Sequence, residues 1–364
     1  METSKRIIAL DAFRGITVAM MILVNTPGSW AYVYPPLDHA EWNGCTPTDL
    51  VFPFFLFIVG ASMWFSFKSF NHQLNSNATR KIIKRVVIIF LIGTAMKLYS
   101  MAMRDNVQFR VLGVLQRIAL AYGMASFIVL SLKKRNIIIS GAFILFAYWF
   151  IMWFFGGSTP YDLETNFERI IDLKIIGEKF MYHGEGIAFD PEGILSTFPA
   201  VVTVIIGYLT GNMIDTVKDR KKMVMQMLLW GIALIVAGLI WNTVFPINKK
   251  LWTSSYVLYT AGWAQVILSF FIWIIDIKNN QKWVQPLIWY GMNPLFIYVM
   301  SIVLVITYLG IHINGTTMYA WLYKDIFVPI AGKMNGSLLF ALFHVVLFGF
   351  VGWIMYRKKI FIKI

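Results

Sequence analysis

IIALDAFRGITVAMMILVNT (residues 7–26) and DLVFPFFLFIVGASMWFSF (residues 49–67) are apolar stretches that flank the polar sequence DHAEWNG (residues 38–44). Each has about the 20 residues that a helix needs to cross the hydrocarbon layer of a membrane. Backbone amides in lipid must bond within their own segment or in a closed barrel, and neither stretch alternates with a two-residue period. Both are therefore predicted to be transmembrane helices, which hold the polar sequence at a membrane face.

The composition extends this prediction to the whole chain. Of the 364 residues, 58% are apolar and only 14% are charged, and the mean hydropathy is +0.66, which is far from the profile of a soluble protein. We predict an all-α, polytopic membrane protein with a single domain, residues 1–364, and about ten transmembrane helices. Their predicted ranges are 7–26, 49–67, 82–101, 111–132, 137–155, 194–214, 223–245, 254–275, 286–308 and 337–356.

Lysine and arginine mark one face of the predicted bundle. They gather in every second loop and at both ends of the chain, and short basic loops stay in the cytoplasm. Both termini are therefore expected to be cytoplasmic, which requires an even number of helices. Residues 38–44 and the longest hydrophilic stretch, 156–193, are then extracytoplasmic, and the longer loop is expected to cover the outer mouth near His39.

The net charge of +14 and the pI of 9.7 are explained by this topology. No RNA- or DNA-binding motif and no continuous basic face accompany them, so nucleic acid is not an expected partner. Cys45 is the single cysteine, which excludes an internal disulfide and a thiolate metal cluster. The histidines have no metal-ligand spacing, and no metal is expected.

Charged residues inside the predicted spans need a partner or a task. Asp11 and Arg14 lie three residues apart on one helical turn and are expected to neutralise each other. Arg110 and Arg117 lie seven apart, on one helix face, with Gln116 beside them. This cation stripe suits phosphates or a carboxylate, and snorkelling of the arginines to lipid headgroups is an equally good explanation.

His39 is the histidine embedded in a dense polar cluster. An imidazole can take up a proton near neutral pH, as a general base must, and Asn25 at the outer end of the first span can orient it or donate to a carbonyl oxygen. A histidine at a membrane interface is more often structural when considered alone. Cys45, six residues further on, is expected to be a packing residue rather than an acyl-accepting thiol.

Several blocks of sequence resemble the transmembrane heparan-α-glucosaminide N-acetyltransferase family, including its short bacterial members. They are LDAFRGITVAMMILVN, HAEWNGCTPTDLVFPFFLFIVGASM, RVLGVLQRIA, FDPEGILSTFPAV, NKKLWTSSYVL and WYGMNPLFIYV, in the family's order. The resemblance implies transfer of the acetyl group of cytosolic acetyl-CoA to the amine of a terminal glucosamine on the far side of the membrane. It also implies that His39 is catalytic, that Asn25 assists it, and that the protein is a homodimer in the lipid bilayer. Because the chain begins almost at once with RIIALDAFRG, a bacterial cytoplasmic (inner) membrane is expected rather than a lysosome.

Further site residues are predicted on the same basis. We expect acetyl-CoA to contact Arg110, Gln116, Arg117, Lys249, Lys250, Trp252 and Asn293. Lys249 and Lys250 are outside in this topology, which is awkward for a nucleotide that comes from the cytoplasm. We expect the amino sugar to contact Asp38, Glu41, Trp42, Asn43, Asp190 and Glu192. An aromatic belt and a helix cap are the alternative explanations for Trp42 and for the sequence Asp190-Pro191-Glu192-Gly193.

Two alternatives stay open. His39 can be the general base for direct attack by the amine, which we favour because an amine is already a capable nucleophile toward a thioester, or it can itself accept the acetyl group. A different class of function is a secondary transporter for N-acetylglucosamine or a related amino sugar. Against the transporter, no paired intramembrane acids suited to proton coupling are evident.

Overall fold

The computed structural model describes residues 7–105 and 107–362, and this part of the chain is mostly helical. Its one sheet there is a two-stranded ribbon of β1 (His312–Ile313) and β2 (Thr316–Thr317). The long helices are α1 (Ile8–Asn25), α2 (Val51–Phe67), α3 (Ser76–Met103), α4 (Val114–Ser131), α5 (Lys134–Phe155), α7 (Thr197–Thr216), α8 (Arg220–Trp241), α9 (Ser254–Phe271), α11 (Pro294–Gly310) and α13 (Val328–Arg357). The shorter ones are α6 (Phe167–Ile175), α10 (Gln285–Met292) and α12 (Met318–Trp321), and π-helical turns η5 (Ile272–Ile277) and η7 (Leu322–Phe327) follow α9 and α12.

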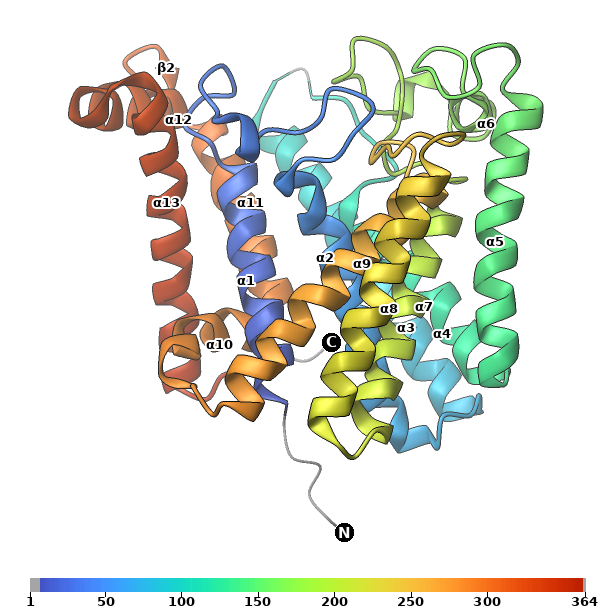
Figure 1. Cartoon of the computed structure of the whole chain (residues 1–364). Helices are drawn as coiled ribbons and strands as arrows, with labels where there is room; N and C mark the ends of the chain where they lie inside the picture. The colour runs from blue at the N-terminus through green and yellow to red at the C-terminus, as the bar shows by residue number, and fades with distance from the viewer. Residues whose placement is uncertain (1–6, 106, 363–364) are drawn as a thin grey trace.

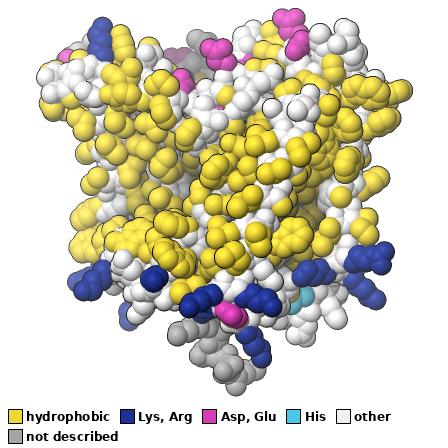
Figure 2. All heavy atoms as spheres, viewed as in Figure 1, with side chains coloured by type: hydrophobic (Ala, Val, Ile, Leu, Met, Phe, Trp, Pro, Cys, Tyr) yellow, Lys and Arg dark blue, Asp and Glu magenta, His cyan; other side chains and the backbone are white. Residues whose placement is uncertain are grey.

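The predicted all-α membrane architecture is confirmed. Within the described residues, nine helices are long and apolar enough to cross a membrane, and the bent pair α10 and α11 makes a tenth if it counts as one span. Figure 1 shows α1 beginning and α13 ending at the same face, below in this view, while α6 and its loops lie at the opposite face. We call these the basic face and the loop face, because lysine and arginine line the lower rim in Figure 2.

The predicted span 286–308 is present as a bent pair of helices rather than as one continuous helix. The helix is broken at Asn293, where α10 and α11 meet at 73°. Asn293 has a non-helical backbone (φ −132°, ψ 52°) because the ring of the following residue, Pro294, disfavours the helical region for the residue before it. The last predicted span, 337–356, lies within the longer part of α13, which follows a kink at Gly332 (φ 74°, ψ 179°).

The helix α2 is the centre of the bundle and is buried over most of its length. It packs on α7 at backbone distance: a Cβ on Gly60 would lie 1.9 Å from the carbonyl oxygen of Val204, and one on Gly207 would lie 2.0 Å from that of Phe57. Such close approach requires glycine at both positions. Since α2 cannot shift along α7, the residues at its first turn have fixed positions in the fold.

Replacing Gly60 by alanine is expected to lower the free energy of unfolding by about 1–3 kcal/mol, because the new methyl group forces the two backbones apart. Gly141→Ala is the matched control, since its Cβ would meet nothing nearer than Val202 Cγ1 at 3.6 Å. The control is expected to be neutral or slightly stabilising, as alanine favours helix. Thermal unfolding of both variants in detergent measures the difference, and equal melting temperatures would contradict the proposed contact.

Candidate active site

A buried carboxylate lies where the chain enters α2. Residues 46–49 (Thr-Pro-Thr-Asp) form a capping box at the start of a 3₁₀ turn, Pro47–Leu50, that continues into α2. Asp49 Oδ2 accepts hydrogen bonds from the backbone N–H of Thr46 (3.0 Å), from its hydroxyl (3.1 Å) and from the N–H of Ala40 (3.0 Å). The side chain of Asp49 is only 1% exposed. This local sequence therefore builds a socket that keeps a negative charge beneath the loop that carries His39.

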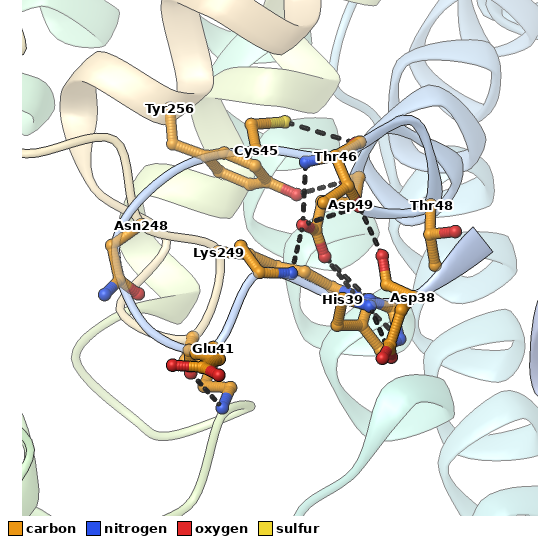
Figure 3. A network of polar contacts seen from close by, with 12 residues as sticks. Asp38, His39, Glu41, Cys45, Thr46, Thr48, Asp49, Asn248, Lys249 and Tyr256 are labelled. Carbon is orange, nitrogen blue, oxygen red and sulfur yellow. Dashed lines mark hydrogen bonds and ion pairs between the residues drawn. The ribbon is translucent and has the colours of Figure 1, made fainter. Parts of the chain in front are cut away.

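His39 and Lys249 complete the site (Figure 3). His39 Nδ1 lies 2.7 Å from Asp49 Oδ1, and Lys249 Nζ lies 3.3 Å from the same oxygen and 3.0 Å from Nδ1. An ionised carboxylate only accepts hydrogen bonds, so the tautomer that fits the contact with Asp49 carries the ring proton on Nδ1, while Lys249 Nζ also lies 3.5 Å from Nε2. The lone pair of the imidazole is then on Nε2, so that nitrogen is the one able to accept a proton.

Lys249 reaches the site from the loop between α8 and α9. The loop is held by Asn248, whose side-chain oxygen accepts from the N–H of Leu251, and whose Nδ2 donates to Asn43 Oδ1 at 3.2 Å. The N–H of Gly44 donates to the carbonyl of Ile247 at 2.7 Å, which joins the two loops directly. Burial lowers the pKa of Lys249, and the charge of Asp49 opposes that shift.

Cys45 is also close to this carboxylate. Burial, with a smaller contribution from the negative charge of Asp49, raises the pKa of the thiol to about 12. The thiolate is therefore scarce at neutral pH, and a thiol is a weak nucleophile. This finding supports packing rather than acyl transfer as the role of Cys45.

A cavity of about 360 Å³ adjoins His39. Asn25, at the end of α1, lines it together with His39, Lys249 and Glu192. Its walls come from α1, α2, α4 and α11, and the lining residues of α11 are Tyr298, Ser301, Ile302 and Val305. These lie at positions i, i+3, i+4 and i+7 of one helix face, so the cavity follows α11 for roughly 10 Å, at 1.5 Å per residue. The structure therefore brings the predicted pair His39 and Asn25 to one elongated cavity.

The predicted donor-binding residue Arg110 is paired with acids of the chain itself. Its Nε donates to Asp190 at 3.0 Å, and its NH2 group forms ion pairs with Asp190 and Glu192. The guanidinium also stacks over the Tyr182 ring, 4.8 Å from its centroid. The nearby carboxylates, opposed by burial, raise the pKa of Arg110, which keeps it charged. Glu192, which lines the cavity, thus has Arg110 as its ion-pair partner.

Three further predicted donor contacts are buried in packing. Arg117 is 1% exposed, donates to the carbonyl of Gly193 and to the Ser196 hydroxyl, and lies over the Trp252 ring at 5.2 Å. Trp252, also 1% exposed, donates from Nε1 to Thr203 at 3.3 Å. Gln116 fills the interface of α3 and α4, where its Nε2 is 3.5 Å from the Phe90 carbonyl.

Asn293 and Lys250 lie apart from these three. Asn293 is at the bend between α10 and α11, where its side chain donates to the carbonyl of Ile360 and accepts from the N–H of Ile362, and so holds the C-terminal segment. Lys250 is at the loop face, where it pairs with Glu185 at 2.5 Å and donates to the Glu41 carbonyl at 2.7 Å. The seven predicted donor residues therefore do not form one cluster.

The predicted sugar contacts divide between the surface and the cavity. Asp38, Glu41 and Asn43 are exposed, and the Asp38 carboxylate accepts from the N–H of His39 at 2.8 Å. Trp42 is fixed by a hydrogen bond from Nε1 to the Tyr161 carbonyl at 2.8 Å and packs edge-on against Phe189. Asp190 is fully buried and Glu192 lines the cavity, so Glu192 is the member of this set nearest to the chemistry.

A pair of buried acids under the cavity wall was not predicted from the sequence. Glu168 and Asp172, on α6, are both fully buried, and a Cβ on Gly193 would lie 2.5 Å from one carboxylate and 2.1 Å from the other. Asp172 accepts from the N–H of Ile194 at 3.0 Å. Burial raises the pKa of Asp172 to about 7 and that of Glu168 well above its usual range. Burial therefore favours the neutral form of both acids, which lie against the segment that carries Glu192.

Asp49 is the site residue that the sequence analysis missed. In the sequence, Asp49 is an acid three residues after a threonine and directly before an apolar span, which is the spacing of a capping box. It was assigned from the sequence only as the first residue of a span. No spacing rule joins Asp49 to Lys249, because the two are brought together by the tertiary fold. Within the described residues, no three His, Cys, Asp or Glu side chains gather as a metal site.

The fold and the site define a polytopic helical membrane protein with a histidine–aspartate pair at one end of an intramembrane cavity. The chain belongs to the heparan-α-glucosaminide N-acetyltransferase family, because the family model for the "Heparan-alpha-glucosaminide N-acetyltransferase, catalytic" region matches residues 6–241. The proteins named heparan-α-glucosaminide N-acetyltransferase from Mus musculus and Homo sapiens are 26% and 27% identical to it over 421 and 417 aligned residues. These alignments cover 100% and 99% of this chain but only 61% and 60% of the relatives.

Asp172→Asn is expected to change how stability depends on pH. A carboxyl group whose pKa is raised in the folded state favours folding while it is protonated, and this contribution is lost as pH rises from the unfolded pKa of about 4 to the folded pKa of about 7. The loss is at most about 4 kcal/mol, and the asparagine variant should lack it. Unfolding at pH 5 and pH 8 measures the slope. Glu164→Gln, in the same loop but exposed, is the control, and equal slopes in Asp172→Asn and wild type would contradict the assignment.

Proposed function

We propose that this protein is a transmembrane N-acetyltransferase that moves the acetyl group of cytosolic acetyl-CoA to the amine of a glucosamine-type sugar on the extracytoplasmic side. Membership of the family supports the reaction class. The observation that carries the proposal is the His39–Asp49 pair at the end of the cavity, with Nε2 as the available base. A homodimer in a bacterial cytoplasmic membrane is part of the same proposal.

The cavity suits the acyl arm of the donor better than its nucleotide. Its walls are mostly apolar, and it follows two turns of α11, so a thin, uncharged arm fits where phosphates do not. The predicted phosphate ligands Arg110 and Lys250 are already paired with Asp190, Glu192 and Glu185. We therefore propose that the phosphates stay at the basic face and that only the acetyl end reaches His39.

The acceptor amine would approach from the loop face. Glu192 lines the cavity. It forms an ion pair with Arg110, but Arg110 also pairs with Asp190, so the negative charge of Glu192 is only partly compensated. A carboxylate in this position attracts an ammonium and holds the sugar beside His39. Asp38 and Glu41 are exposed at the rim of the same loop, where they suit sugar hydroxyls.

Direct transfer can be written with the residues present. The sugar ammonium loses one proton to solvent, and the amine nitrogen attacks the thioester carbonyl while His39 Nε2 takes its second proton. The C–N bond forms, the C–S bond breaks, and the imidazolium returns the proton to the departing sulfur. Asp49 holds the ring and stabilises the imidazolium, while Lys249 limits the negative charge of the carboxylate.

Two side chains are placed to stabilise the oxygen of the thioester. Asn25 lines the cavity, and its side chain makes no hydrogen bond within the described residues. Of the hydroxyls on the wall, those of Thr26, Thr48 and Ser301 donate to backbone carbonyls. The hydroxyl of Tyr298 has no such partner in the part of the chain that the structure describes. We propose that Asn25 and Tyr298 donate to the carbonyl groups of the donor.

The activity is tested with purified protein, acetyl-CoA and glucosamine, with release of free thiol as the measurement. We expect CoA release that depends on both substrates and falls at least about 10³-fold in His39→Ala, since the general base is lost. His183→Ala is the matched control, because its ring only contacts the Met181 carbonyl in the outer loop. Sugar uptake into liposomes without an acetyl donor, with no CoA release, would instead support the transporter.

Asp49→Asn separates the role of the pair from that of His39 alone. An amide facing Nδ1 can donate to it, which moves the ring proton to Nε2 and removes the base. We expect kcat to fall by roughly 10²–10⁴-fold with little change in KM. Asp162→Asn, the same substitution at an exposed acid of the outer loop, is the control. A stable acetyl group on His39 after incubation with labelled acetyl-CoA alone would replace direct transfer by the two-step route.

A further inference from the structure

A cleft of about 410 Å³ opens between α8 and α9 at the basic face. On one side it is lined by Lys221, Val224, Met225 and Leu228 of α8, which share one helix face, and on the other by Ser269, Phe270 and Trp273. Met225, Phe270 and Trp273 are 57%, 55% and 41% exposed. The cleft therefore presents apolar walls on the outside of the bundle.

The shape of the cleft follows from the two helices. Nearer the loop face α8 and α9 touch at backbone distance, since a Cβ on Gly231 would lie 3.0 Å from the Gly262 carbonyl and one on Gly238 would lie 2.9 Å from that of Ser255. Toward the basic face α9 continues into the π-helical turn η5, and in Figure 1 it leans away from α8. A widened π turn commonly redirects a helix, and here no side chain of the described residues fills the space between them.

Two cations stand at the basic end of this cleft. Lys221 is part of its lining, and Lys278 Nζ lies over the ring of Trp273, 5.4 Å from the centroid. Neither forms an ion pair within residues 7–105 and 107–362. The acid beside Lys221 in sequence, Asp219, accepts hydrogen bonds from the backbone N–H groups of Lys221 and Lys222 as the cap of α8. Positive charge at the mouth of an apolar cleft is complementary to a ligand with an anionic end and an apolar body.

The same construction recurs on other helices. An apolar cleft of about 510 Å³ between α10 and α13 is walled by Trp289, Phe350 and Trp353. Arg357 lies over the Trp353 ring at 5.8 Å, again at the end of the cleft toward the basic face. Figure 2 shows the pattern as a rim of lysine and arginine directly below a broad apolar surface. Each of the two clefts, on different helix pairs, thus has a tryptophan in its wall and a cation over the ring of that tryptophan.

We propose that the cleft between α8 and α9 is a binding site for one phospholipid with an anionic headgroup. An acyl chain lies between Val224, Leu228 and Phe270, and the headgroup phosphate is bound by Lys221 and Lys278. Basic pockets between transmembrane helices bind anionic lipids through these two terms together, burial of the chain and attraction of the phosphate. The site lies outside the cavity that His39 adjoins and does not depend on the proposed transferase activity.

Delipidated protein in detergent, titrated with phosphatidylglycerol or with phosphatidylcholine of the same acyl chains and observed by native mass spectrometry, tests the proposal. We expect tighter binding of phosphatidylglycerol. In Lys221→Gln/Lys278→Gln this preference should fall by about fivefold for each lost cation, and the number of retained lipids should fall by one. Lys174→Gln/Lys179→Gln, which removes two lysines of the outer loop, is the matched control and should leave binding unchanged.

A second variant guards against a change in folding. Leu228→Trp fills the cleft and keeps both cations, so it should lower the binding of both lipids while the melting temperature stays within a few degrees of wild type. Equal affinity for the two lipids, or an unchanged preference in the double lysine variant, would overturn the proposal. Displacement of the lipid by inorganic phosphate at equal concentration would also overturn it, because the apolar cleft would then contribute nothing.

Discussion

The buried carboxylate of Asp49 is the constraint on which the candidate site depends. A charge that is 1% exposed costs several kcal/mol unless hydrogen bonds and counter-charges compensate for the lost water. Here the compensation comes from the Thr46 and Ala40 amides, the His39 ring and the ammonium of Lys249. The glycine contacts between α2 and α7 fix the position of Asp49 at the start of α2. The groups that compensate its charge therefore gather at that position. The geometry of the site is thus a consequence of satisfying one charge.

The same need for compensation divides the molecule into two electrically different faces. At the loop face three cations near the site form ion pairs within the chain: Arg110 with Asp190 and Glu192, Lys250 with Glu185, and Lys249 with Asp49. These pairs tie the loop 38–44 to the loops before α7 and α9, so they act as braces for the site. Along the basic face, cations such as Lys278 and Arg357 lie over tryptophan rings instead.

The sequence predicted the fold well because a membrane leaves few choices. Length and hydropathy identify a span, and the nine long helices lie close to predicted ranges. The bend at Asn293 was missed because an apolar run continues through it, although Pro294 was a local sign of the break. His39 was predicted from its polar surroundings, and Asp11 and Arg14 do form the predicted ion pair, at 3.0 Å. The contact of Lys249 with His39 was not predicted, since it spans 210 residues and no periodicity encodes it.

Selective transfer of an acyl group across the bundle needs a path that admits a neutral arm and refuses charge. The wall formed by α1, α2 and α11 meets the first need with residues such as Met21, Phe52 and Ile302. The same wall refuses charge because a phosphate in this cavity would lose its hydration without gaining a free cation. This desolvation cost exceeds the free energy gained by burying the acyl arm. The charges that do line the cavity are at its loop end, where Lys249 and Glu192 are each already engaged. In the proposed reaction, the acyl thioester therefore reaches His39 from the cavity while the charged acceptor comes from water, and the two meet at the imidazole.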